Sequence, residues 1–137
     1  MAYNLRHINV LDLRPSTGIG VALPFSAPSV FTTVYTTKEQ LKYNIINFLL
    51  TNPRERIFLP NYGAGIRQKL FEQISQDTTD NLDLQIRVGI EQNFTNVKIV
   101  NLTFGGDPDR NLLTITFSYT INNTGESDTV ILNLNGQ

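Results

Sequence analysis

The chain has 137 residues, of which 40% are hydrophobic and 17% charged, and its net charge is −1 at pH 7. This length suits one domain with its own core, while the composition excludes a disordered chain and argues against a dedicated nucleic-acid binder. The absence of cysteine excludes disulfides, thiolate zinc sites and cysteine nucleophiles. No apolar stretch approaches the roughly 20 residues that span a bilayer, and no signal peptide is apparent, so we expect synthesis in the cytoplasm and no membrane partner.

Charge is distributed unevenly between the two halves of the chain. Up to Leu70 there are eight Lys and Arg residues against three acidic residues, and after it three basic residues against nine acidic ones. The first half is therefore positive and the second half negative. Either the halves pair with each other inside the fold, or they form two surfaces suited to different neighbours.

Residues 1–30 combine apolar residues with structure breakers. The stretch RPSTGIGVALPFSAPSVF holds three prolines and two glycines, which disfavours one continuous element. Its apolar residues nevertheless alternate with period two, at Ile19, Val21, Leu23 and Phe25. We expect residues 1–30 to form an extended N-terminal arm and residues 31–137 to form a single domain.

The segment VYTTKEQLKYNIINFLLTN predicts a helix. Thr36 and Glu39 have the spacing of a capping box at its start. Pro53 disfavours helical backbone at the residue before it, so the helix should end near Thr51.

Two further helices are expected. A short one covers GIRQKLFE, with Ile66 and Leu70 facing inward. A longer one begins at about Thr79, and apolar residues recur along it every four positions, at Leu82, Ile86, Ile90 and Phe94.

The remainder of the chain has the alternation of β-strands. In NVKIVNLTF the inward residues shift from Val97 and Ile99 to Leu102 and Phe104, a change of parity that indicates a bulge near Val100. The segment GGDPDR is expected to turn the chain.

Two more strands follow, and their inward residues alternate with polar ones. These residues are Leu113, Ile115, Phe117, Tyr119 and Ile121 in LLTITFSYTI, then Val130, Leu132 and Leu134 in TVILNLN. The predicted fold class is α+β, with helices packed on one face of a three- to four-stranded antiparallel sheet and the N-terminal arm outside.

The densest charge cluster, Arg54, Glu55 and Arg56, follows directly on the first helix in LTNPRERIFLPNYGAG. The prolines on either side of it should make this segment stiff. The cluster is either a solvated helix end or a recognition surface in which Glu55 orients both guanidinium groups toward a partner, and we favour the second. The apolar residues of the segment are interpreted as shaping this surface; they are Ile57, Phe58, Leu59 and Tyr62.

Catalysis is not expected. A glycosidase needs two carboxylates across a cleft, one of them a proton donor, and Glu55 and Glu72 are the acidic residues that flank the unusual segment. Two adjacent arginines favour the ionised form of Glu55, which makes it a poor donor. With a single histidine, His7, nucleophilic hydrolysis lacks its machinery as well. We predict no catalytic residue, no metal site and no cofactor.

Residues 17–73 resemble the baseplate wedge family of contractile phage tails, whose members are known as sheath initiators and historically filed as lysozyme-like. The shared pattern is a helix ending in Leu-Leu-Thr, Pro or Gly, Glu-Arg, an apolar pair, Pro, an aromatic-Gly pair and Leu-Phe-Glu. Its residues here are Leu49, Leu50, Thr51, Pro53, Glu55, Arg56, Ile57, Phe58, Pro60, Asn61, Tyr62, Gly63, Leu70, Phe71 and Glu72. Two positions depart from it, since many members have Gly at position 54 and Asp at position 61. A role for an acid at position 61 is therefore not carried over.

The resemblance implies a structural protein that lies between the wedge proteins and the first ring of sheath subunits. It implies that the sheet accepts strands from the sheath protein, which would satisfy the free backbone groups of a sheet edge. The wedge contact is predicted at Arg54, Glu55, Arg56, Pro60 and Tyr62, and the strand exchange at Thr114, Thr116, Ser118, Thr129, Ile131 and Asn133.

The resemblance also implies a place in the virion tail baseplate after synthesis in the host bacterium. Tube or hub proteins are further candidate partners, and a six-fold tail implies six copies of the chain. Two alternatives stay open, which are the equivalent component of a secretion or injection system and a lysozyme-like glycoside hydrolase.

Overall fold

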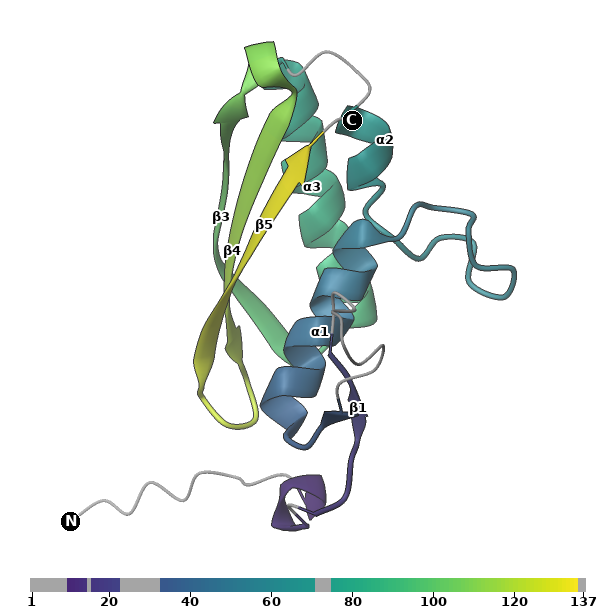
Figure 1. The fold of residues 1–137 in the computed structure, drawn as a ribbon, viewed down its shortest axis with the longest axis vertical. Coiled ribbons are helices and arrows are strands. Elements are labelled where there is room, and N and C mark those ends of the chain that lie inside the picture. The colour runs from purple at the N-terminus through teal and green to yellow at the C-terminus, as the bar shows by residue number, and fades with distance from the viewer. Residues whose placement is uncertain (1–9, 15, 23–32, 71–74, 136–137) are drawn as a thin grey trace, which may run out of the picture.

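The computed structural model describes residues 10–14, 16–22, 33–70 and 75–135. Figure 1 shows a three-stranded sheet on one side of the molecule and the helices on the other. The described helices include none that is long and apolar enough to cross a membrane. The predicted fold class, helices on one face of an antiparallel sheet, is confirmed.

Helix α1, Thr37–Leu50, begins and ends where the sequence predicts. The Thr36 side chain accepts a hydrogen bond from the Glu39 backbone N–H, which caps the first turn. At the other end, the Thr51 N–H donates to the carbonyls of the last turn. Its buried face consists of Ile45, Ile46, Phe48 and Leu49.

Helices α2, Ile66–Leu70, and α3, Gln76–Asn93, follow. Ile66 is buried, as predicted, whereas Phe71 and Glu72 lie outside the described residues. Helix α3 begins earlier than predicted because Ser75 caps it and its polar first turn carries no apolar period. The predicted stripe is confirmed, with Leu82, Ile86 and Ile90 buried and Phe94 half-buried at the C-cap.

The larger sheet consists of β3, Val97–Asp107, β4, Leu112–Ile121, and β5, Ser127–Asn135. The strands are antiparallel in the order β3-β4-β5, so β4 is the central strand. The register shifts between Ile99 and Asn101, which confirms the bulge at Val100. Strand β3 runs further than predicted, through the glycine pair, and the 3-10 helix η2, Pro108–Arg110, joins it to β4.

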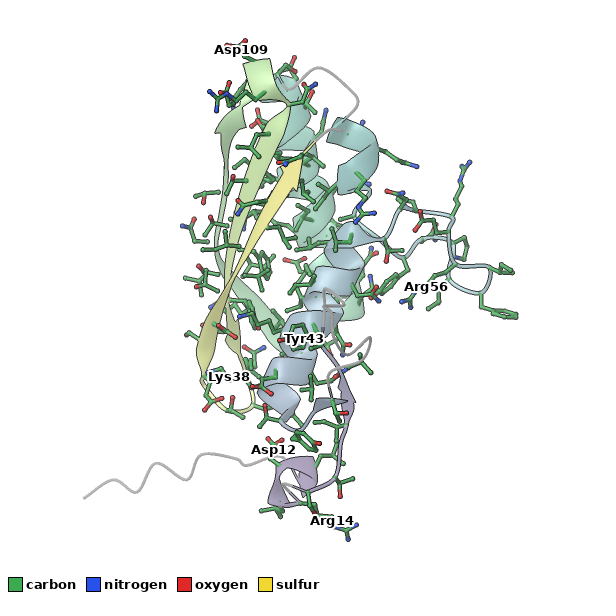
Figure 2. All side chains as sticks on the ribbon, viewed as in Figure 1. Asp12, Arg14, Lys38, Tyr43, Arg56 and Asp109 are labelled. Atoms are coloured by element: carbon green, nitrogen blue, oxygen red, sulfur yellow. The ribbon has the colours of Figure 1, made fainter. Side chains whose placement is uncertain are left out.

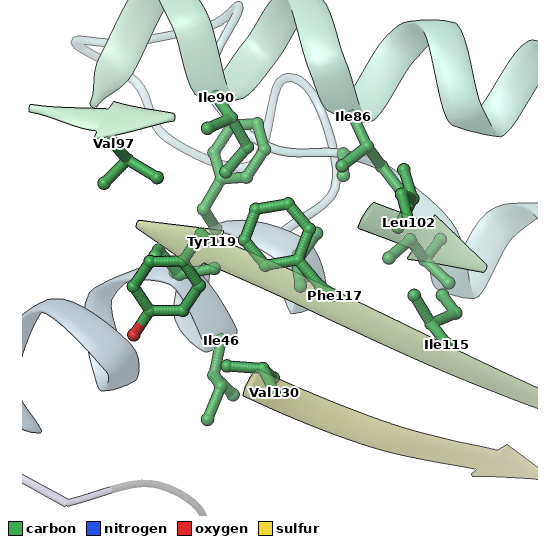
Figure 3. Close-up of a cluster of buried hydrophobic side chains, with 14 of the residues drawn as sticks. Ile46, Ile86, Ile90, Val97, Leu102, Ile115, Phe117, Tyr119 and Val130 are labelled. Carbon is green, nitrogen blue, oxygen red and sulfur yellow. The ribbon is translucent and has the colours of Figure 1, made fainter. Parts of the chain in front are cut away.

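The core lies between the inner face of this sheet and the helices. Every second residue of β4 is buried, as the alternation predicts. Figure 3 shows the rings of Phe117 and Tyr119 beside Ile86 and Ile90 of α3, and the two ring centroids lie 5.5 Å apart. Val130 of β5 completes the inner layer.

The N-terminal segment is fastened to the start of α1. It forms a short 3-10 helix η1, Val10–Leu13, and a strand β1, Gly20–Val21, that pairs with β2, Thr33–Val34. The Asp12 carboxylate accepts hydrogen bonds from the Thr37 N–H at 2.7 Å and its hydroxyl at 2.6 Å. This carboxylate stabilises the N-terminal end of α1, where backbone N–H groups are free. The expected apolar positions Leu23 and Phe25 lie outside the described residues.

Candidate protein-binding surfaces

The segment between α1 and α2, residues 52–65, is a loop whose base is fixed to the end of α1. The Ala64 N–H donates to the Phe48 carbonyl at 3.1 Å, and the Gly65 N–H donates to the Thr51 carbonyl at 3.2 Å. Gly63 has φ +119, and a Cβ there would lie 2.4 Å from the Thr51 carbonyl oxygen. Only glycine allows this close approach with a positive φ, so the base of the loop depends on it.

A second closure lies halfway along the loop. The Arg54 N–H donates to the Pro60 carbonyl at 2.8 Å, and the Leu59 N–H donates to the Arg56 carbonyl at 3.3 Å. Arg54 has φ 72, a left-handed conformation that is uncommon for a residue with a side chain. The closure makes the loop a defined turn that projects from the body of the molecule (Figure 1).

Glu55 acts inside the loop. Its carboxylate accepts hydrogen bonds from the Asn52 N–H at 3.1 Å and from the Asn52 side-chain amide at 2.8 Å. No ion pair joins Glu55 to Arg54 or Arg56 within the described part of the chain. The expectation that Glu55 orients both guanidinium groups is therefore not met among the described residues, where the Glu55 carboxylate bonds to Asn52 instead.

Arg56 also contacts its own loop. Its guanidinium carbon lies 4.1 Å from the centroid of the Tyr62 ring, a cation–π arrangement. The Tyr62 ring packs edge-on against Phe48, with centroids 5.2 Å apart, and Phe48 packs in the same way on Phe94. Burial raises the pKa of Tyr62, and the positive charge of Arg56 partly opposes this. Arg56, labelled in Figure 2, thus contacts the ring that packs against the core residue Phe48.

The tip of the loop, Ile57–Leu59, consists of residues that the sequence suggests only shape the charged surface. Ile57 is 90% exposed, Phe58 95% and Leu59 53%. Three consecutive apolar residues between a charge cluster and a proline carry neither helical nor strand periodicity. That run was the available signal, because exposed apolar runs of this length are unusual unless they serve a function.

The six residues predicted for strand exchange lie together on the outer face of β4 and β5. They form three directly opposed pairs, Thr114 with Asn133, Thr116 with Ile131, and Ser118 with Thr129. In two of these pairs the side chains are hydrogen-bonded, at 3.0 and 3.1 Å. The three on β4 belong to a strand with a bonded neighbour on each side. An added strand therefore cannot pair with the backbone of β4, so Thr114, Thr116 and Ser118 could contact it through their side chains alone.

Strand β5 forms one edge of the three-stranded sheet, with no described strand on its outer side. The Ile121 N–H donates to the Glu126 carbonyl at the hairpin end, and hydrogen-bonded pairs alternate from there along an antiparallel ladder. The backbone groups of Val130 and Leu132 then point to β4, and those of Thr129, Ile131 and Asn133 point away from it. The Thr129 N–H agrees with this, since it donates to the Asp128 carboxylate at 2.8 Å instead of to β4.

Other features of the described surface suggest no chemistry. A groove of about 720 Å³ lies between the N-terminal segment, the start of α1 and the β4–β5 turn, and its lining mixes apolar side chains such as Leu11 and Leu41 with polar ones such as Asn44, Asn96 and Glu126. Among the described residues, no group of three or more His, Cys, Asp or Glu side chains could hold a metal ion.

A family model described as "Baseplate wedge protein gp25" matches residues 36–126. The match spans helix α1, the loop, α2, α3 and the sheet as far as the β4–β5 turn. No curated protein matches the chain.

Two solved structures share the fold. One is a candidate tail lysozyme from Geobacter sulfurreducens, with 17% identity and a TM-score of 0.66 over 77% of this chain and 96% of that one. The other is a chain of the anti-feeding prophage baseplate, with 17% identity and a TM-score of 0.50 over 83% of this chain and 80% of that one. At this identity the likeness concerns the fold alone.

Proposed function

The chain belongs to the family of baseplate wedge protein gp25, and from this membership we propose that it starts the tail sheath by accepting a strand of the first sheath ring along β5. Its class, a structural component of a baseplate, follows from the family. The finer role is our proposal. One observation carries it: β5 has no strand on its outer side in the described chain, and its backbone groups there are unpaired by the ladder.

The two edges of the sheet differ in how well they could receive a strand. The β3 edge is interrupted by the bulge at Val100 and carries the charge of Lys98, two features that protect edges from pairing. Strand β5 pairs with β4 without a register shift from Ser127 to Asn135. An incoming strand would find N–H and C=O groups at every second residue of β5, with Ile131 exposed among polar neighbours.

The loop would serve the opposite side, toward the wedge proteins. Arg54 is exposed and has no ion pair in the described part of the chain, so its guanidinium fork is free for a carboxylate. Glu55, Arg56, Pro60 and Tyr62 would contribute by holding the loop in shape. Of the five residues predicted for the wedge contact, Arg54 would therefore touch the partner, and the other four would hold the loop in the conformation that presents Arg54.

Amide hydrogen exchange tests the strand acceptance at single residues. The full chain is measured by NMR alone and with the tail sheath protein of the same system. We expect the amides of Thr129, Ile131 and Asn133 to slow in the complex. The amides of Val130 and Leu132, already bonded to β4, are the internal control and stay slow in both states. A bound sheath protein that leaves the first three unchanged would refute strand addition at β5.

The host machine and the copy number belong to the proposal too. The anti-feeding prophage structure is described as six-fold symmetrised, and a component of such a particle would be present six times. A phage tail and an injection particle remain equally suitable hosts. The lysozyme name of the other structure does not lead us to propose glycoside hydrolysis for this chain. Of the two candidate carboxylates, Glu55 is hydrogen-bonded to Asn52, and Glu72 lies outside the described residues.

A further inference from the structure

The loop tip, Ile57–Leu59, exposes more apolar surface than any neighbouring part of the described chain. Ile57 and Phe58 are at least nine-tenths exposed, and the loop carries them away from the core (Figure 1). An isolated exposed leucine is ordinary, whereas a large aromatic residue beside an isoleucine at the end of a projecting loop is not.

The exposure is built into the backbone. The Arg54–Pro60 hydrogen bond closes the loop below the tip, and the Arg56–Leu59 bond closes the tip itself. The base is fixed by Gly63 against Thr51. Because these contacts prevent the tip from folding back onto the core, no part of the chain that the structure describes can bury its apolar side chains. A preformed turn also loses little conformational entropy on binding.

The charges around the tip indicate what that molecule looks like. Arg54 lies exposed beside the tip without an ion pair in the described residues, and the Glu55 carboxylate is occupied by Asn52. An apolar centre with a free guanidinium at its margin matches an apolar socket that has carboxylates on its rim.

We propose that the loop tip is a plug that enters an apolar, acid-rimmed socket on a neighbouring baseplate wedge protein, with Phe58 as its anchor. The inference rests on the proposed baseplate function and names the chemistry of one partner. It differs from the charged contact predicted from the sequence, because the binding energy comes from the apolar side chains and the arginine selects the socket.

A second copy of this chain is a poorer occupant. The groove at the start of α1 exposes the polar groups of Asn44, Asn96 and Glu126 among its apolar side chains, and an apolar plug would leave the hydrogen bonds of these groups unmade. A wedge protein is the better fit, since a baseplate component must be held by neighbours other than its own copies.

The test measures binding of the full chain to purified wedge proteins of the same tail by calorimetry. The double variant Ile57→Ser with Phe58→Ser is compared with the control Leu84→Ser with Val88→Ser, which removes two exposed apolar residues from α3. We expect the tip variant to bind at least about tenfold more weakly and the control to bind like the wild type. Both variants should unfold at the wild-type temperature, because neither pair is buried.

Three outcomes would overturn the proposal. The first is wild-type affinity of the tip variant. The second is an equal loss in the α3 control, which would indicate nonspecific adhesion. The third is a wild-type dimer that the tip variant converts to a monomer in sedimentation, which would assign the tip to a second copy. When one of these outcomes occurs and sheath protein still slows exchange of the β5 amides, the plug proposal fails and the proposed function stands. If wild-type chain shows no protection either, the proposed function fails with it.

Discussion

Phe117 and Phe58 are the same kind of side chain in opposite situations. Phe117 lies on the inner face of β4 and is fully buried, whereas Phe58 lies at the loop tip and is 95% exposed. The first is surrounded by residues of α3 and the neighbouring strands (Figure 3). The second is held away from them by backbone hydrogen bonds.

The difference separates residues that stabilise this fold from residues that can only act outside it. Burial of an aromatic side chain on folding contributes a few kcal/mol, and Phe58 contributes almost none of it. Since no described residue covers Phe58, the explanation that we propose for it is a partner. Four predictions test this contrast, in order of their expected effect on the free energy of unfolding.

Replacing the two phenylalanines gives the largest contrast. Phe117→Ala should lower the free energy of unfolding by about 3–5 kcal/mol, because it removes buried contacts and leaves a cavity. Phe58→Ala should change it by less than about 0.5 kcal/mol, as surface substitutions do. Urea unfolding of both variants measures the difference. Comparable losses would mean that Phe58 packs against the body in solution.

Gly63→Ala probes the base of the loop. The new Cβ would meet the Thr51 carbonyl oxygen at a positive φ, so we expect a loss of about 2–3 kcal/mol. Gly125 is the matched control, since it has φ +71 with open space around it, and its replacement should cost about 1 kcal/mol. Thermal unfolding compares the two. Equal shifts would contradict a tight base.

Tyr119 sharpens the description of the core. Its hydroxyl is buried without a partner in the described residues, so Tyr119→Phe should raise stability at pH 7 by about 1 kcal/mol. Burial raises the Tyr119 pKa above 10, and nearby Asp128 adds to this. The Tyr119 hydroxyl therefore loses its proton at a lower pH in the unfolded chain than in the folded one. The wild type should lose stability above about pH 10 for this reason. Urea titrations at pH 7 and pH 11 should show a smaller loss in the variant; an equal loss would place the effect elsewhere.

Arg56→Ala has the smallest expected effect on folding. Loss of the contact with Tyr62 should cost about 0.5–1 kcal/mol, leaving a folded monomer, while the loosened loop should block baseplate assembly in a complementation assay. Arg110→Ala is the control, because Arg110 is exposed on η2 and pairs with nearby Asp107. Normal tails from the Arg56 variant would remove the loop from the assembly contact.

Local features were predictable to the residue where a local rule sets them. The N-cap at Thr36, the end of α1 at Thr51 and the bulge at Val100 are examples. The start of α3 was not, because Ser75 caps a polar turn without apolar periodicity. The candidate surfaces were found in part. The loop was identified by its charges, but the function of Glu55 and the exposure of Phe58 were not.

The sequence by itself determined the helices, the alternation along β4 and the family pattern around the loop, because side-chain periodicity and capping depend on residues a few positions apart. Only the tertiary structure decided that β4 is central, that β5 keeps a free edge and that the loop tip points to solvent. These properties arise from the pairing of distant segments and from a glycine pressed against the Thr51 carbonyl. Contacts of this kind leave no periodic signal in the chain.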